Sequence, residues 1–313
     1  MDVCEQIPVL AVTGPTASGK TALAVRLAQA MDGEVVSADS MQIYTGLRIS
    51  TAKPTAEEMQ GVPHHLLDFL PPDTPFSVAD YCDRAKACIA AIHAHGKLPI
   101  LCGGTGLYIR SLLDNIDFSG SGADPDFRKQ MQTLADTQGT EAVWRLLWEA
   151  DPEGAETLHP NNLGRVIRAL ELHRETGQTM AQQRRNSRKN PTPYNSCLLC
   201  LDFRDRQKLY DRIDRRVDIM MQNGLLDEAR DFYEKYSGTE GTARQAIGCK
   251  EFIPYFAGER TLDEAVACVK QETRRYAKRQ LTWFRRMDNM HFIYVDDTAD
   301  VFASAMAVVD GWR

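Results

Sequence analysis

Residues 9–21 read VLAVTGPTASGKT, an apolar run followed by the pattern G-x-x-x-x-G-K-T. The apolar run predicts a buried strand, and the residues after Lys20 have the spacing of an amphipathic helix. Glycines at positions 14 and 19 let the backbone curl around a phosphate, and the helix N-terminus adds the positive end of its dipole. Strand, loop and helix therefore agree in predicting a phosphate-binding loop, for a nucleotide or for another phosphate.

The loop offers a cation and a hydroxyl in addition to its backbone. Lys20 would neutralise phosphate charge, and the Thr21 hydroxyl would bind a phosphate-bound Mg²⁺, which is the cofactor that this pattern predicts. The predicted phosphate-binding residues are Gly14, Pro15, Thr16, Ala17, Ser18, Gly19, Lys20 and Thr21.

Two further segments place polar residues where strands are expected to end. Residues 34–40 predict a second strand ending near Asp39, and residues 97–102 predict a buried strand that stops at a glycine turn containing Thr105. Because parallel strands end at the ligand crevice, both residues are expected near the phosphate loop. A helix cap or structural ion pair is the alternative for Asp39. The repeated units predict a P-loop NTPase-like α/β fold, a doubly wound parallel sheet flanked by helices.

The strand pattern stops in the middle of the chain. A Gly- and Ser-rich joint at residues 118–125 precedes helical periodicity that continues to about residue 193, which predicts an all-α insertion domain. A basic cluster at residues 184–189 is expected to be exposed and mobile. The predicted division is an α/β core over residues 1–117, a helical insertion over 118–195, and the second part of the core, with a long basic helix, over 196–313.

Composition and charge limit the environment and the partners. Hydrophobic residues make up 43% and charged residues 26% of the 313-residue chain, and no apolar run approaches the ~18 residues of a membrane span. The eight cysteines are scattered, mostly in apolar segments. Buried thiols in a reducing cytoplasm are therefore expected, without a membrane anchor. The net charge of −6 combines an acidic first half with a basic second half.

Basic residues in the second half suggest contacts with phosphates. Arg212 and Arg216 share one face of a predicted helix, where they could clamp a diphosphate unless neighbouring aspartates neutralise them. Lys278 and Arg279 lie in a long helix with interleaved aromatic residues, a pattern that suits RNA phosphates and bases. An exposed basic face over a buried aromatic stripe explains the same spacing equally well.

Several motifs together resemble the tRNA dimethylallyltransferase family, also called tRNA isopentenyltransferases or IPP transferases, of the bacterial type. They are GPTASGKT at 14–21, DSMQIY at 39–44, TAKP at 51–54, GGTGLY at 103–108, HPNN at 159–162, RIDRR at 212–216, QAIG at 245–248 and KRQLTW at 278–283. Two positions depart from the usual family residues, with Ser50 in place of Gly and Cys249 in place of Tyr.

This resemblance implies transfer of a dimethylallyl group from dimethylallyl diphosphate to the exocyclic amine of the adenosine beside the tRNA anticodon, position 37, with release of diphosphate. It implies that Asp39, as base, acts with Thr16 and Arg216 in catalysis, and that Arg216 and Mg²⁺ help to hold the diphosphate. The residues implied to contact tRNA are Asp39, Ser40, Met41, Gln42, Thr105, Arg128, Arg165, Arg168, Arg244, Gln245, Gly248, Lys278 and Arg279.

Other functions stay open on the residues alone. A small-molecule or nucleotide kinase would use the same loop, an aspartate base and an arginine clamp, although such enzymes seldom need a helical insertion and a long basic helix. A tRNA-binding protein without catalysis is a further alternative, and a related group of enzymes prenylates free adenine nucleotides. The expected assembly is a monomer without an obligate protein partner.

Overall fold

The computed structural model describes residues 6–118, 124–187, 190–238 and 241–312, and the chain divides into two compact units. The core unit comprises residues 1–113 and 193–313, and the helical unit comprises residues 114–192. This division lies a few residues before each of the boundaries that the sequence predicts. Of the predicted joint, residues 119–123 lie outside the described residues, as do residues 188–189 of the basic cluster.

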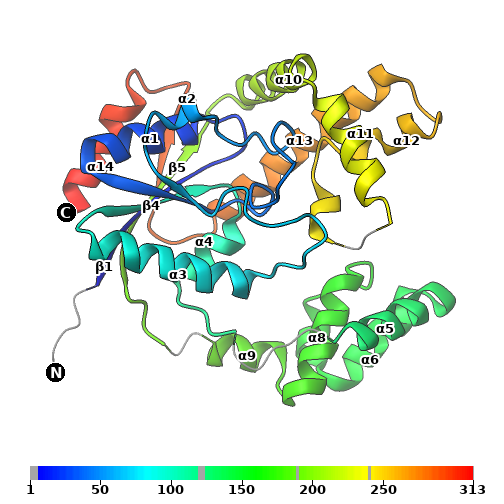
Figure 1. The fold of residues 1–313 in the computed structure, drawn as a ribbon. Coiled ribbons are helices and arrows are strands. Elements are labelled where there is room, and N and C mark those ends of the chain that lie inside the picture. The colour runs from blue at the N-terminus through cyan, green and yellow to red at the C-terminus, as the bar shows by residue number, and fades with distance from the viewer. Residues whose placement is uncertain (1–5, 119–123, 188–189, 239–240, 313) are drawn as a thin grey trace, which may run out of the picture. The chain divides into compact units, whose positions relative to one another are not determined.

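A six-stranded sheet runs through the core unit, in the order β3-β2-β4-β1-β5-β6 (Figure 1). The strands are β1 (Ile7–Thr13), β2 (Gly33–Ser37), β3 (His64–His65), β4 (Leu98–Gly103), β5 (Tyr194–Asp202) and β6 (Met290–Tyr294). Every pair is parallel, and central β1 pairs with both β4 and β5. The predicted parallel sheet is therefore confirmed, and its strands end at one common edge.

Helices cover the sheet and bury its apolar residues. They are α1 (Lys20–Met31), α2 (Ala56–Met59), α3 (Val78–Ala94), α4 (Gly106–Leu113), α10 (Arg206–Gln222), α11 (Leu225–Tyr236), α12 (Ile253–Phe256), α13 (Leu262–Phe284) and α14 (Val301–Trp312), with short 3₁₀ turns at Thr242–Gln245 and Lys250–Phe252. Leu10, Val12 and Leu199 of the sheet pack with Leu27 of α1 and Val309 of α14 in one cluster. Burying such side chains supplies most of the stability of the unit.

Local signals explain where the long helices begin. At the start of α3, the Ser77 side chain accepts a hydrogen bond from the Asp80 N–H, and the Asp80 side chain accepts one from the Ser77 N–H. Thr261 and Glu264 form the same reciprocal box at the start of α13. Each box satisfies N–H groups that the first turn leaves unpaired, and so fixes where each helix begins.

The helical unit contains α5 (Pro125–Gln138), α6 (Thr140–Ala150), α7 (Pro152–Glu156), α8 (Leu163–Thr176) and α9 (Met180–Asn186), with no strand among its described residues. Val143 and Leu147 of α6 pack against Val166 and Leu170 of α8 in its core. The first part of the basic cluster, residues 184–186, belongs to α9. A capping box at Thr179 starts α9, which continues through Asn186.

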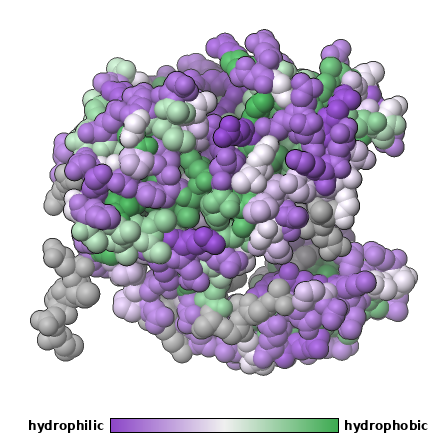
Figure 2. Space-filling view, viewed as in Figure 1, coloured by the Kyte–Doolittle hydropathy of each residue, from purple (hydrophilic) through white to green (hydrophobic). Residues whose placement is uncertain are grey.

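The described residues also show the character of the surface and the state of the cysteines. Among the described residues, no helix is both long enough and apolar enough to cross a membrane. The face in Figure 2 is mostly hydrophilic, and hydrophobic residues show through near the centre of the core unit. The seven described cysteines are free thiols, and most of them are buried.

Candidate active site at the phosphate loop

The loop between β1 and α1 has the curled backbone that an anion site requires. Gly14, Ala17 and Gly19 have positive φ values of 144°, 63° and 93°. A Cβ at Gly14 would lie 2.8 Å from the Leu201 carbonyl oxygen, so this position needs glycine. At the other end Gly19 starts α1 without a side-chain cap. The first N–H groups of α1 are therefore open to an anion.

Polar groups inside the loop support the same interpretation. Ser18 is 2% exposed, and its hydroxyl has no hydrogen-bond partner among the described residues. A buried hydroxyl without a partner is costly unless a ligand or water satisfies it. The loop thus contains an unsatisfied polar atom where the sequence predicts a bound phosphate.

Gln280 of α13 joins this loop to the turn after β4. Its Oε1 accepts a hydrogen bond from the Thr16 N–H at 2.9 Å, and its Nε2 donates to the Gly104 carbonyl at 3.1 Å. A Cβ at Gly104 would lie 2.0 Å from Nε2, so glycine makes room for this bridge. Sequence reasoning missed this role, although Gln280 lies within the KRQLTW motif.

Three charged side chains lie close together at the crevice. Burial lowers the pKa of Lys20, and nearby Arg216 lowers it further, while the charge of Asp39 opposes both effects. Burial also lowers the pKa of Arg216, against the attraction of Glu58 and Asp39. In the described part of the chain, neither cation belongs to an ion pair within 4.0 Å. Desolvated cations without a pairing carboxylate suit a bound anion such as a diphosphate.

The carboxylate of Asp39 is held by backbone just beyond β2. Its Oδ1 accepts hydrogen bonds from the N–H groups of Met41 at 2.9 Å and Gln42 at 3.4 Å. Next to it, the Ser40 N–H donates to Thr105 Oγ1 at 3.0 Å, and the Thr105 hydroxyl donates to Ser40 Oγ at 3.3 Å. The structure therefore brings Asp39, Ser40 and Thr105 together from the ends of β2 and β4.

Tyr276 of α13 adds a second hydroxyl to this group. Its phenol lies near the side chains of Thr105 and Gln280 and within electrostatic reach of Asp39. Burial raises the pKa of Tyr276, with the charge of Asp39 acting in the same direction. The phenol therefore stays protonated at neutral pH and is available as a donor. No local pattern singled out this tyrosine from its neighbours.

The two arginines of α10 differ in their surroundings, although they are one turn apart. Arg212 Nε donates to the Ala17 carbonyl at 2.9 Å and so supports the back of the phosphate loop. Two of the aspartates that could neutralise the arginines pair instead with cations of α13. Asp214 binds Arg274 at 2.5 Å and Asp218 binds Lys270 at 2.6 Å. Arg216 is thus left to face Lys20 and Asp39.

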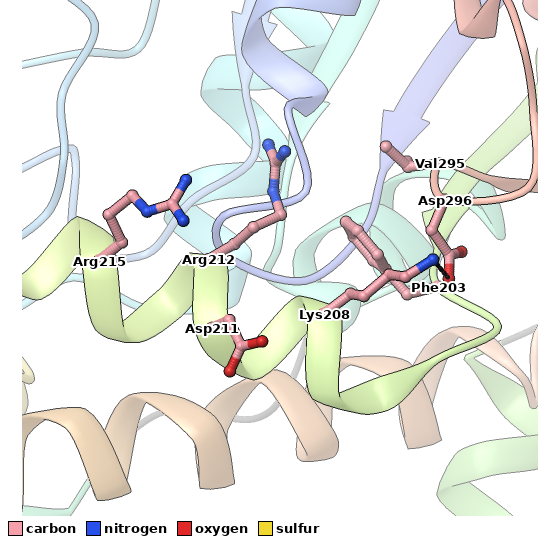
Figure 3. A pocket seen from close by; sticks show the side chains of 7 residues that line it. All are labelled: Phe203, Lys208, Asp211, Arg212, Arg215, Val295 and Asp296. Carbon is pink, nitrogen blue, oxygen red and sulfur yellow. Dashed lines mark ion pairs between the residues drawn. The ribbon is translucent and has the colours of Figure 1, made fainter.

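A cavity of about 370 Å³ lies beside α10, on the side of Arg212 (Figure 3). Its lining residues are Phe203, Lys208, Asp211, Arg212, Arg215, Val295 and Asp296. Lys208 pairs with Asp296 at 3.8 Å, and Asp296 also accepts hydrogen bonds from the Arg204 and Asp205 N–H groups. Much of the charge in this cavity is therefore already matched within the protein.

The surroundings of Thr21 suit a metal ion that is bound mainly through a ligand. Its hydroxyl lies within hydrogen-bonding reach of the Cys102 thiol, whose pKa is raised to about 11 by burial. The described residues contain no group of three or more His, Cys, Asp or Glu side chains that could hold a metal ion. Mg²⁺ often binds through substrate phosphates, water and one protein oxygen, so one hydroxyl beside a phosphate loop fits it.

The remaining candidates of the core unit lie on a 3₁₀ turn, on the loop that follows it and on α13. Arg244 and Gln245 are exposed in the turn Thr242–Gln245, and Lys278 and Arg279 are exposed on α13. Gly248 is buried with a φ of 96°, and its N–H donates to Glu251 Oε2 at 2.8 Å. The exposed side chains can reach a large ligand, whereas Gly248 shapes its loop.

In the helical unit, a buried carboxylate holds two of the three candidate arginines. Glu171 is 1% exposed, and it binds Arg128 at 2.7 Å and also pairs with Arg168. Burial alone would raise the pKa of Glu171, but hydrogen bonds from Arg128, the Asp124 N–H and Arg168 lower it to about 2. Arg165 is exposed and forms no ion pair with a described residue. Two candidates are therefore also structural partners, and Arg165 is not.

The two residues that depart from the usual family pattern both lie near Glu228 of α11. The Ser50 hydroxyl donates to Glu228 Oε1 at 2.6 Å. Cys249 is buried in the same cluster as Leu225 and Ala229 of α11, and burial raises the pKa of its thiol to about 12. Both residues therefore lie beside α11.

A model of the family described as IPP transferase matches residues 42–287 of this chain. The chain belongs to this family. The match covers most of both units, including Gln42, Arg216 and the KRQLTW motif. The resemblance seen in the sequence is therefore confirmed.

Known IPP transferases are similar to this chain over nearly its full length. A tRNA dimethylallyltransferase of Caldanaerobacter subterraneus is 48% identical over 297 residues, which is 93% of each chain. The enzyme of the same name from Bacillus subtilis is 48% identical over 94% of this chain and 92% of its own. These relatives are bacterial, as the motifs predict.

Solved structures extend the similarity to the fold. A tRNA isopentenylpyrophosphate transferase from Bacillus halodurans has a TM-score of 0.73 at 42% identity, covering 98% of this chain and 97% of its own. A eukaryotic dimethylallyltransferase described as acting on tRNA has a TM-score of 0.82 at 30% identity, covering 96% of this chain and 77% of its own. The sheet and helices described above are thus those of this family.

Proposed function

We propose that this chain transfers a dimethylallyl group from dimethylallyl diphosphate to the exocyclic amine of the adenosine beside the tRNA anticodon, position 37, and releases diphosphate. The observation that supports this most is the crevice where Lys20 and Arg216, which form no ion pair with a described residue, face Asp39. Such a crevice pairs an anion site with a candidate base, as a diphosphate donor and an amine acceptor require. Membership of the IPP transferase family supports the choice of substrates.

The phosphate loop would hold the diphosphate as a leaving group. As the allylic C–O bond breaks, negative charge grows on the departing oxygen, where Lys20 and Arg216 would stabilise it. The Thr16 N–H is already engaged by Gln280, so we assign the Thr16 side chain, rather than its backbone, to the diphosphate. When bound beside Thr21, Mg²⁺ would supply further charge neutralisation on the diphosphate.

Asp39 would act on the other reactant. The adenine amine nitrogen attacks the first carbon of the dimethylallyl group, the diphosphate leaves with the C–O electron pair, and the amine proton passes to the Asp39 carboxylate. Because two backbone N–H groups hold Oδ1, the carboxylate keeps one orientation toward the amine. The same end of the sheet is lined by Ser40, Met41, Gln42 and Thr105, which would position the adenine. The adenine must leave its base stack in the RNA to reach them.

Exposed basic residues would bind the anticodon arm. On the core unit these are Arg244, Lys278 and Arg279, beside Gln245 and the turn at Gly248. On the helical unit, Arg165 is proposed as a phosphate contact, and Arg128 and Arg168 as contacts that also serve Glu171. We further propose a cytoplasmic monomer, since the described cysteines are free thiols and tRNA is modified in that compartment.

Mass spectrometry of the reaction product tests the proposal. An unmodified anticodon stem-loop with adenosine at position 37 is incubated with the protein, Mg²⁺ and dimethylallyl diphosphate, and a parallel sample receives ATP instead. We expect a mass gain of one dimethylallyl group only with the allylic diphosphate. A stem-loop with guanosine at that position is the matched control and should gain no mass. No gain on either RNA, with ATP consumed in the presence of small acceptors, would support the kinase instead.

A further inference from the structure

The carboxylate of Glu228 sits among hydrogen-bond donors from a distant part of the chain. Glu228 belongs to the first turn of α11. Its Oε2 accepts from the N–H groups of Arg48 and Ile49, both at 2.7 Å. Its Oε1 accepts from the N–H of Ser50 at 2.8 Å and from the Ser50 hydroxyl at 2.6 Å. Four short bonds to an ionised group therefore fix the loop of residues 48–52 against α11.

The same loop holds the side chain of Gln42 at both ends of its amide. Gln42 Nε2 donates to the carbonyl oxygens of Thr51 at 3.1 Å and Ala52 at 3.2 Å. Gln42 Oε1 accepts from the Ser37 hydroxyl at 3.3 Å. The position of the Gln42 side chain is thus set by β2 on one side and by this loop on the other.

Gln42 in turn contacts the candidate base. Asp39 Oδ1 accepts a hydrogen bond from the backbone N–H of Gln42 at 3.4 Å and another from that of Met41 at 2.9 Å. A contiguous set of contacts therefore runs from Glu228 through residues 48–52 and Gln42 to Asp39. No residue of this set belongs to the phosphate loop, and Glu228 contacts the set at the end opposite to Asp39.

We infer that Glu228 is a positioning residue for the transfer reaction. Through residues 48–52 and Gln42, it holds the Asp39 carboxylate in the orientation that accepts the adenosine amine proton. The inference rests on the proposed function, because it needs Asp39 to be the base. A small displacement of a catalytic group lowers the rate of the chemical step more than it lowers binding.

The first test replaces Glu228 by glutamine, which keeps its size but presents an NH₂ group to N–H donors. We expect Glu228→Gln to lower kcat by about 10- to 100-fold, with an unchanged KM for dimethylallyl diphosphate. Asp227→Asn is the matched control, because Asp227 is exposed in the same helical turn and loses the same charge. The control should keep the wild-type kcat. A wild-type kcat in Glu228→Gln, or an equal loss in both variants, would overturn the inference.

A double-mutant cycle asks whether Glu228 acts through Gln42. Gln42→Ala and Glu228→Gln should each lower kcat, and the double variant should be little worse than the more damaged single variant. Losses that multiply would show that the two residues act independently, and the positioning role would be rejected. In wild type and Glu228→Gln, hydrogen exchange at the amides of residues 48–50 should differ in protection, and Asp227→Asn should match wild type.

Two further comparisons keep the inference testable if Glu228→Gln fails to fold or if the proposed substrate is wrong. Ser50→Ala removes one of the four donors and keeps three, so we expect a folded protein with kcat lowered by about fivefold. An unchanged kcat in Ser50→Ala together with an unfolded Glu228→Gln would reject the inference in favour of a purely structural role. If wild type itself transfers no dimethylallyl group, the proposed function fails, whereas changed exchange at residues 48–50 would still show the loop contact.

Discussion

The core unit and the helical unit use their buried charges in opposite ways. At the phosphate loop, Lys20 and Arg216 are desolvated near Asp39 and belong to no ion pair in the described chain. In the helical unit, Arg128 and Arg168 converge on Glu171, which is 1% exposed. The first arrangement keeps its charges for a ligand, whereas the second uses them to hold helices together. Whether charged side chains are paired within the protein therefore distinguishes a ligand site from a structural contact better than the residue types do.

The largest effect is expected at Asp39, where the comparison predicts chemistry rather than structure. Asp39→Asn should lower kcat by about 10³-fold, because the amide cannot accept the amine proton. Binding of the stem-loop and the melting temperature should stay near wild type, since Asn keeps an oxygen for the Met41 N–H. Single-turnover assays and a filter-binding titration measure the two quantities. Turnover at the wild-type rate would remove Asp39 as the base.

Arg216 should come next, because its charge faces the leaving group. Arg216→Gln is expected to lower kcat by about 10²-fold through lost stabilisation of the departing diphosphate. Arg215→Gln is the matched control, since it removes the same charge from an exposed position on the next residue of α10. Steady-state kinetics with dimethylallyl diphosphate compare the two. Equal losses would mean that the net charge of α10, and not the crevice, determines the rate.

A substitution of Glu171 tests whether the paired charges of the helical unit stabilise its fold. Glu171→Gln should destabilise the helical unit by about 2 kcal/mol, because charge-assisted bonds to Arg128 and Arg168 are lost. Exposed Glu175→Gln is the control and should leave the melting temperature unchanged. The folded-state pKa of about 2 is below the ordinary glutamate value of 4.5, so this stabilisation is present above about pH 4.5 and is lost as the pH falls toward 2. A melt that is independent of pH across this window would contradict the assignment.

The smallest effect should separate Arg165 from Arg168. Arg165→Ala is expected to weaken stem-loop binding a few-fold and to reduce the salt slope by about one, without changing stability. Arg168→Ala should weaken binding and also lower the melting temperature, because it removes a partner of Glu171. Titrations across a salt series, paired with thermal melts, distinguish the two. If the two variants share one stability and one slope, the distinction drawn from Glu171 is wrong.

Prediction from the sequence succeeded where a local pattern reports the structure. Apolar runs predicted β1 and β4. The amphipathic helix α11 was missed, although Leu225, Ala229 and Phe232 form a buried face with helical spacing. Glu228 lies on α11 and was missed with it, and its hydrogen-bond partners lie 178 to 180 residues away along the chain. No local signal marks such a partner.

The sequence by itself determined the phosphate loop, the parallel sheet and the placement of Asp39 at a strand end. These follow from glycine positions and from periods of two or a few residues, which act between near neighbours. Only the tertiary structure decided which distant groups are paired. Arg128 and Glu171 are 43 residues apart, and Thr16 and Gln280 are 264 apart. Ion pairs and hydrogen bonds of this kind form when packing brings distant groups within about 3 Å, which no local pattern encodes.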